Sequence, residues 1–107
     1  MTHAEFQSFM RSLPSNETTR QRVQIGEIHL SIQAHKFAYC SPRENGRQEY
    51  YEWEIGYTSE PIPELIPYAE SDDCTNTVYG YVPTGVILEI ITRLGEIKEY
   101  QLTSTNQ

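Results

Sequence analysis

The stretch Tyr39-Cys40-Ser41-Pro42-Arg43-Glu44 gathers residue types suited to binding a small anionic ligand. It joins an aromatic ring, two small polar groups and an arginine at the mouth of a predicted hairpin. Arginine presents a rigid fork of donors that matches a phosphate or a carboxylate. The structural alternative is that Pro42 ends a strand and that Arg43 pairs with Glu44 or Glu49 in solvent.

A second candidate surface is Tyr79-Gly80-Tyr81. Residues two apart in a strand lie on one face, so the two tyrosines share a face, and Gly80 permits the close approach of a backbone or ligand on the other. Simple packing under a helix is the alternative. Because the chain has only eight basic residues, each arginine near such a surface matters. The candidate ligand-binding residues are Tyr39, Ser41, Arg43, Arg47, Tyr79, Tyr81 and Arg93.

No catalytic constellation stands out in the sequence. It has no glycine-rich phosphate loop, nucleophile elbow or His-Glu-x-x-His motif. Cys40 with a histidine would supply a nucleophile and a base, but nothing in the sequence places an oxyanion hole. Asp72 and Asp73 lack the ligand pattern of an EF-hand, and Cys40 and Cys74 lack metal-ligand spacing. We predict no enzyme activity, metal or cofactor.

One hairpin organises the elements that must position these residues. Apolar and polar side chains alternate over residues 28–34 and again over 51–57, which predicts two strands. Val23 and Ile25 extend the first of these strands toward the N-terminus, with Gly26 as a break. Asn45-Gly46 lies between them and is a strong hairpin-turn signal, because both residues tolerate positive φ. The apolar residues occupy even positions up to Ala34 and odd positions at Phe37 and Tyr39. This change predicts one extra residue, a β-bulge, near His35-Lys36.

The remaining elements extend or cover this ribbon. Thr2 and Glu5 have the spacing of a capping box that opens an amphipathic helix. A short helix at 64–70, a strand at 77–82, a helix ending at Gly95 and an edge strand at 96–102 follow. We predict an α+β fold with a mostly antiparallel four-stranded sheet and two to three helices. The predicted division is 1–22 for the N-terminal helix and polar linker, 23–102 for the core domain and 103–107 for a polar tail.

Composition limits the classes of function. At 107 residues the chain fits one domain, and its net charge of −7 disfavours binding to a nucleic-acid duplex. No run of 18 apolar residues and no signal peptide is present, so we expect no membrane partner, a cytoplasmic location and free thiols. The first helix offers an apolar stripe of Phe6, Phe9 and Met10, which either docks on the sheet or meets another subunit. Because the aliphatic core is also small, we expect a homo-oligomer.

Four stretches of the chain together resemble a known family. They are Ser31 to Ala34, Tyr39 to Glu44, Tyr51 to Gly56 and Thr77 to Pro83, within a region of roughly residues 28–95. They resemble the small phage-encoded proteins of the viral anti-Thoeris sponge family, whose members bind cyclic ADP-ribose-type immune signals and in some cases cyclic oligonucleotides. Several members end the last helix in His-Gly-Gly-Ile and have serine at the position of His35, so this chain departs from them at two points that bear on a ligand pocket.

The resemblance implies an anti-defence protein in the host cytoplasm that sequesters a cyclic nucleotide without turnover. Aromatic residues of the sheet would contact the base, and arginines of the hairpin or last helix would contact phosphates.

A second hypothesis is an acidic inhibitor that covers a host enzyme, or a DNA-mimic-like protein, since an acidic surface speeds association with a basic partner. Its surface would use Glu49, Glu52, Glu54, Glu60, Glu64, Glu70, Asp72 and Asp73. A salt-sensitive complex with a host protein, without a bound nucleotide, would favour this hypothesis.

Overall fold

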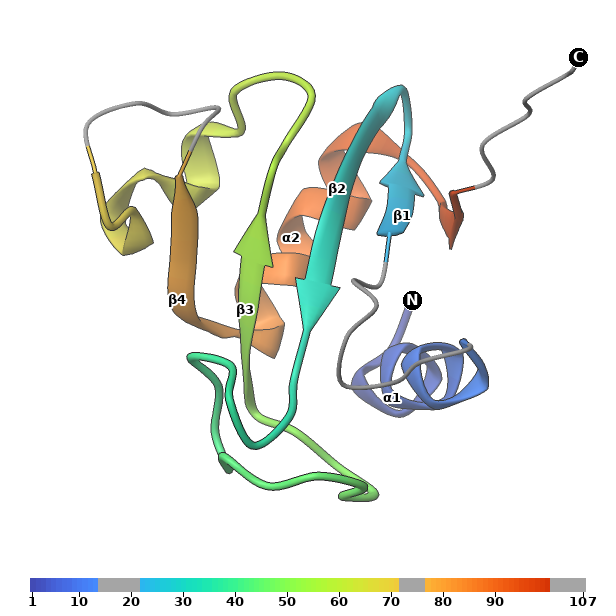
Figure 1. Cartoon of the computed structure of the whole chain (residues 1–107). Coiled ribbons are helices and arrows are strands. Elements are labelled where there is room, and N and C mark those ends of the chain that lie inside the picture. Colours follow the sequence, from blue (N-terminus) through green and yellow to red (C-terminus); the bar gives the residue numbers. More distant parts are fainter. Residues whose placement is uncertain (14–21, 72–76, 101–107) are drawn as a thin grey trace, which may run out of the picture.

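The strands form one antiparallel sheet with the order β4-β3-β2-β1-β5 (Figure 1). The structure, a computed structural model, describes residues 1–13, 22–71 and 77–100. Its elements in chain order are α1 (His3–Ser12), β1 (Arg22–Ile25), β2 (Ile28–Gln33), β3 (Glu52–Gly56), the 3₁₀ helix η1 (Pro63–Tyr68), β4 (Val78–Pro83), α2 (Thr84–Leu94) and β5 (Ile97–Glu99). The predicted α+β class and antiparallel pairing are confirmed.

The sheet has a core face and an open face. On the core face, cross-strand partners such as Val23 and Leu30 are apolar and fully buried. Helix α2 lies behind this face in Figure 1 and buries Ile87 and Ile90 against it. The open face is turned toward the viewer. Its polar strand residues are all at least partly exposed. They are Arg22, Gln24, His29, Gln33, Glu54 and Lys98.

Helix α1 begins where the sequence predicts. Thr2 caps it: its hydroxyl accepts from the Glu5 N–H at 3.1 Å, and the Glu5 carboxylate accepts from the Thr2 N–H at 2.7 Å. The ring of Phe6 meets Trp53 edge to face, with 5.2 Å between centroids. The predicted apolar stripe is therefore largely used inside its own domain, where Phe6 and Met10 join the core and Phe9 packs against it. It does not serve as the exposed stripe from which we expected oligomerisation.

Within the described residues the sheet has five strands, one more than predicted, because a tight turn divides the first predicted strand. Gly26 has φ 60° and, with Glu27, forms the two-residue connection between β1 and β2. A Cβ at Gly26 would lie 2.4 Å from the carbonyl oxygen of Leu94, so both the backbone conformation and the space require glycine.

The predicted hairpin between β2 and β3 exists, but its connection is long. β2 ends at Gln33 and β3 begins at Glu52, so residues 34–51 form a loop below the sheet in Figure 1. Asn45-Gly46 makes a turn within this loop, with φ 68° at Gly46. The expected bulge near His35 is wrong, because the parity change there marks the end of the strand. The bulge is in β4, where two residues oppose the single Glu54.

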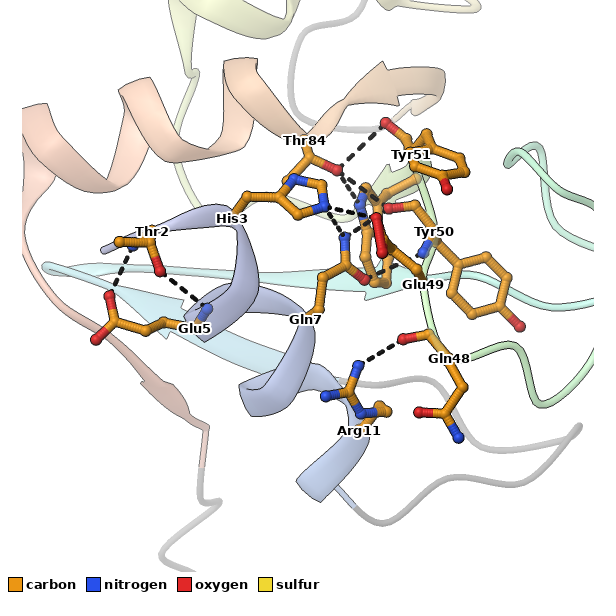
Figure 2. Close-up of polar contacts among 11 residues, drawn as sticks. Thr2, His3, Glu5, Gln7, Arg11, Gln48, Glu49, Tyr50, Tyr51 and Thr84 are labelled. Atoms are coloured by element: carbon orange, nitrogen blue, oxygen red, sulfur yellow. Dashed lines mark hydrogen bonds and ion pairs between the residues drawn. The ribbon is translucent and has the colours of Figure 1, made fainter.

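The return limb of this loop is held by α1 and α2. Gln7 is buried, and its side-chain amide both donates to the Tyr50 carbonyl oxygen at 2.6 Å and accepts from the Tyr50 N–H at 3.1 Å (Figure 2). Arg11 donates to the Gln48 carbonyl oxygen. At the start of α2, the Thr84 N–H donates to the Tyr51 carbonyl oxygen at 3.0 Å. Side chains far away in sequence therefore fix this limb through its backbone.

The last predicted elements are confirmed. α2 follows Pro83 and ends at Gly95, which has φ 128°, and β5 is an edge strand. The predicted linker and tail, together with Asp72, Asp73 and Cys74, lie outside the described residues. None of the helices in the described part of the chain has the length and apolar character that a bilayer crossing requires.

Candidate functional site

Two exposed tyrosines and an arginine lie together beside the β4 edge of the sheet. The rings of Tyr39 and Tyr81 are stacked, with 6.1 Å between centroids and 25° between planes. The guanidinium carbon of Arg43 lies 5.8 Å from the centroid of the Tyr39 ring. Both tyrosines keep about two fifths of their surface exposed, 42% for Tyr39 and 41% for Tyr81. We call these three residues the tyrosine–arginine cluster.

The β4 bulge determines where Tyr81 points. Trp53 pairs with Val82 and Ile55 with Tyr79, so two residues of β4 lie opposite one of β3. Tyr81 has φ 54°, a conformation that costs a non-glycine residue roughly 1–2 kcal/mol. Its N–H donates to the Tyr39 carbonyl oxygen at 2.9 Å, which ties the bulge to the loop. The expectation that Tyr79 and Tyr81 share a face is wrong, because Tyr79 is fully buried while Tyr81 turns outward.

Gly80 makes room for Tyr39. A Cβ at Gly80 would lie 3.1 Å from the Tyr39 Cβ and 3.4 Å from a carboxylate oxygen of Glu70. The close approach expected at this glycine therefore exists, and the neighbour is the loop tyrosine. The Tyr39 N–H also donates to the Glu54 carboxylate at 3.1 Å. Sequence reasoning did not assign Glu54 to the site, although its place on the polar side of β3 was a usable signal.

The backbone next to Tyr39 is fixed by Cys40 and Ser41. The Cys40 thiol is buried and lies 3.3 Å from the carbonyl oxygens of His35 and Pro42, to either of which it can donate. Burial raises the pKa of this thiol, so Cys40 is unsuited to act as a nucleophile. The Ser41 N–H donates to the Glu52 carbonyl oxygen at 3.1 Å, and the following Ser41–Pro42 peptide bond is cis.

Arg43 is the predicted arginine that stays available to a ligand. No carboxylate of the described residues lies within ion-pair distance of it. Its two expected solvent partners are engaged elsewhere, since Glu44 pairs with Arg47 at 3.3 Å and Glu49 with His3 at 3.2 Å. Residues 34–47 carry three basic side chains and one acid, a net charge of +2 in a chain of −7. The loop is therefore a local concentration of positive charge.

Arg93 lies apart from the cluster. Its Nε and Nη2 donate to the two carboxylate oxygens of Glu64 at 2.6 and 2.7 Å, which joins α2 to η1. The hydrogen bonds from Arg93 lower the pKa of Glu64 and raise that of Arg93. Arg93 is therefore committed to a structural ion pair.

The structure thus brings together three of the seven predicted ligand-binding residues, Tyr39, Arg43 and Tyr81, and places the backbone of Ser41 beside them. Tyr79 is in the core, while Arg47 and Arg93 are in ion pairs. The described part of the chain contains no group of three His, Cys, Asp or Glu residues that could hold a metal ion. Comparison with known proteins finds no matching family model, curated protein or solved structure.

Proposed function

We propose that this protein is a phage anti-defence protein that binds a cyclic nucleotide immune signal at the tyrosine–arginine cluster and holds it without turnover. The ligand is of the cyclic ADP-ribose type or a cyclic oligonucleotide. The observation that carries the proposal is an arginine that has no acidic partner among the described residues and lies beside two exposed, stacked tyrosines.

The chemistry of the cluster suits a nucleotide. A base stacks on an aromatic ring with a gain of about 1–3 kcal/mol. The Arg43 guanidinium supplies paired donors for a phosphate, and charge-assisted hydrogen bonds contribute about 1.5–3 kcal/mol each. The positive charge of residues 34–47 offsets the acidic total of the chain where the phosphate binds. A flat surface and a nearby cation are the two features that a nucleotide requires.

Sequestration is favoured over catalysis by the groups that surround the cluster. Cys40, the neighbouring residue with nucleophilic character, is buried with a raised pKa. The Glu54 carboxylate accepts the backbone N–H of Tyr39, so it acts as a support for the loop. These roles favour a rigid binding surface over a set of acid, base and nucleophile.

The experiment is a thermal-shift screen against cyclic ADP-ribose isomers and cyclic di- and trinucleotides at constant salt. A ligand at one hundred times its dissociation constant stabilises the folded state by about 2.7 kcal/mol, which gives a clear rise in melting temperature. The bound ligand is then released by denaturation and analysed by mass spectrometry. Recovery of the intact nucleotide supports a sponge, whereas recovery of a hydrolysed product identifies an enzyme. A flat screen across all ligands contradicts the proposal and favours the acidic inhibitor.

A further inference from the structure

A second cluster of donors lies on the open face, away from the β4 bulge. Gln24 of β1 lies directly opposite both His29 of β2 and Lys98 of β5, so these three residues form a row across three strands. Arg22, two residues before Gln24, is on the same face, and the Tyr100 N–H donates to its carbonyl oxygen at 3.2 Å. We call Arg22, His29, Lys98 and Tyr100 the open-face cluster.

The hydrogen bond between Arg22 and His29 fixes the state of the imidazole. The Nη2 atom of Arg22 lies 2.6 Å from the Nδ1 atom of His29. A guanidinium can only donate, so Nδ1 accepts in this hydrogen bond, and Nε2 is the ring nitrogen that can donate. His29 therefore presents an N–H donor at Nε2.

The tyrosine ring holds both partners in place. His29 is stacked on Tyr100, with 4.6 Å between centroids and 21° between planes. The guanidinium carbon of Arg22 lies 5.7 Å from the centroid of the same ring. The backbone of His29 is also fixed, because its N–H donates to the Ser59 hydroxyl at 3.0 Å and its carbonyl oxygen accepts from the Ser59 N–H at 2.9 Å. Arg22 and His29 are thus held in place before any ligand arrives.

The charge of the cluster is not neutralised within the described residues. Neither Arg22 nor Lys98 has a carboxylate within ion-pair distance among them, although the chain carries fifteen acids. The adjacent Glu99 lies opposite Val23 and hence on the core side of the sheet. Two positive charges and the Nε2 donor of His29 thus share one solvent-facing surface that the tyrosine–arginine cluster does not use.

We infer that the open-face cluster is a separate site for an oxyanion ligand, with a diphosphate as the best-fitting class. Neighbouring strands are about 4.8 Å apart, so His29 and Lys98 are separated by roughly 10 Å across β1. The long side chains of Arg22 and Lys98 can close on a ligand with two anionic groups across this span.

The test uses the full chain carrying Arg43→Gln, so that the tyrosine–arginine cluster cannot account for binding of an anion. Pyrophosphate is titrated at constant ionic strength and followed by calorimetry and by amide NMR. We expect saturable binding with shifts centred on Arg22, His29 and Lys98. Adding Arg22→Gln or Lys98→Gln to this background should each weaken binding about tenfold, as expected for loss of one charge-assisted contact. Adding Arg47→Gln, the matched control on the distant loop, should change nothing.

Two further readouts make the test decisive. The Nδ1 nitrogen of His29 should report acceptance of a hydrogen bond from Arg22. Malonate, a dicarboxylate, replaces pyrophosphate in a parallel titration, and weaker binding of malonate identifies phosphate as the preferred class. The inference is overturned by the absence of saturable binding up to about 10 mM, by equal affinity in the Arg22→Gln and Arg47→Gln proteins, or by a proton on His29 Nδ1, which would rule out the hydrogen bond from Arg22. These outcomes do not depend on the nucleotide screen, because Arg43 is absent throughout.

Discussion

The two limbs of the 34–51 loop have opposite characters. The outgoing limb exposes Phe37, Tyr39 and Arg43 and is attached mainly by backbone contacts to β3 and β4. In the return limb, residues 48–51 are fixed by side chains of α1 and α2. The difference indicates that one limb anchors the loop so that the other can present a cationic and aromatic surface. Mutations in the two limbs should therefore separate stability from binding.

The largest effect on stability should come from Gln7→Ala in the anchor of the return limb. Gln7 provides the partner of the buried Tyr50 N–H, whereas the Tyr50 carbonyl oxygen would keep the Thr84 hydroxyl as a donor at 3.3 Å. Leaving one buried N–H unpaired and losing two hydrogen bonds should lower the free energy of unfolding by about 2–3 kcal/mol, measured by urea denaturation. Ser8→Ala on the exposed side of the same helix is the control. A loss below about 0.5 kcal/mol would show that α1 does not anchor the loop.

A smaller effect, of opposite sign for stability, should follow from Tyr81→Gly in β4, next to the outgoing limb. Glycine tolerates the φ of 54° at this position, so the change relieves roughly 1 kcal/mol of backbone strain while removing an exposed ring. We expect an equal or higher melting temperature, together with about tenfold weaker nucleotide binding from lost stacking.

Tyr57→Gly is the matched control for that substitution. Tyr57 also has a positive φ, 53°, but lies outside the tyrosine–arginine cluster, so nucleotide affinity should not change. Equal losses of affinity in the Tyr81 and Tyr57 variants would mean that the tyrosine ring of the cluster does not contact the ligand.

The smallest effect should come from the Arg93–Glu64 pair, which is partly exposed and belongs to neither limb. Because Arg93 lowers the pKa of Glu64, the pair stabilises the fold above the unfolded glutamate pKa of about 4.5. That contribution is lost as the pH falls through the lower pKa of the folded state. The melting temperature of Glu64→Gln should lie below that of the natural protein at pH 7 and converge with it at pH 3. A gap that widens at low pH would contradict this assignment.

Local patterns were enough to predict most of the elements. The capping box at Thr2, the period-two strands and the apolar face of α2 each depend on neighbours a few residues away, and the structure confirms them. The division at Gly26 was treated only as a break, because a Gly-Glu turn is a weaker signal than Asn-Gly. The prediction that Asn45-Gly46 joins the two strands directly was wrong, because residues 34–51 form a long loop. This loop is held by Gln7, which is 43 positions from Tyr50.

The candidate site was predictable only where its residues are close together in the sequence. Tyr39 and Arg43 are near one another in sequence, and their types alone indicated a ligand surface. The outward turn of Tyr81 depends on a bulge in the pairing of two strands, which periodicity cannot reveal. Whether an arginine is available depends on which acids reach it. Glu64 reaches Arg93 across 29 positions of sequence, whereas Glu44 pairs with Arg47 and, in the part of the chain that the structure describes, leaves Arg43 without an acidic partner.

The most direct measurement of the central claim compares nucleotide affinity in Arg43→Gln and Arg47→Gln by calorimetry, using the cyclic nucleotide that gives the largest thermal shift. Both residues lie on the same loop and both changes remove one positive charge, but Arg47 pairs with Glu44 and Arg43 contacts Tyr39. We predict at least a tenfold loss for Arg43→Gln, equivalent to about 1.4 kcal/mol, and less than a twofold change for Arg47→Gln. Equal affinity in the two variants would contradict the assignment of the tyrosine–arginine cluster as the ligand site.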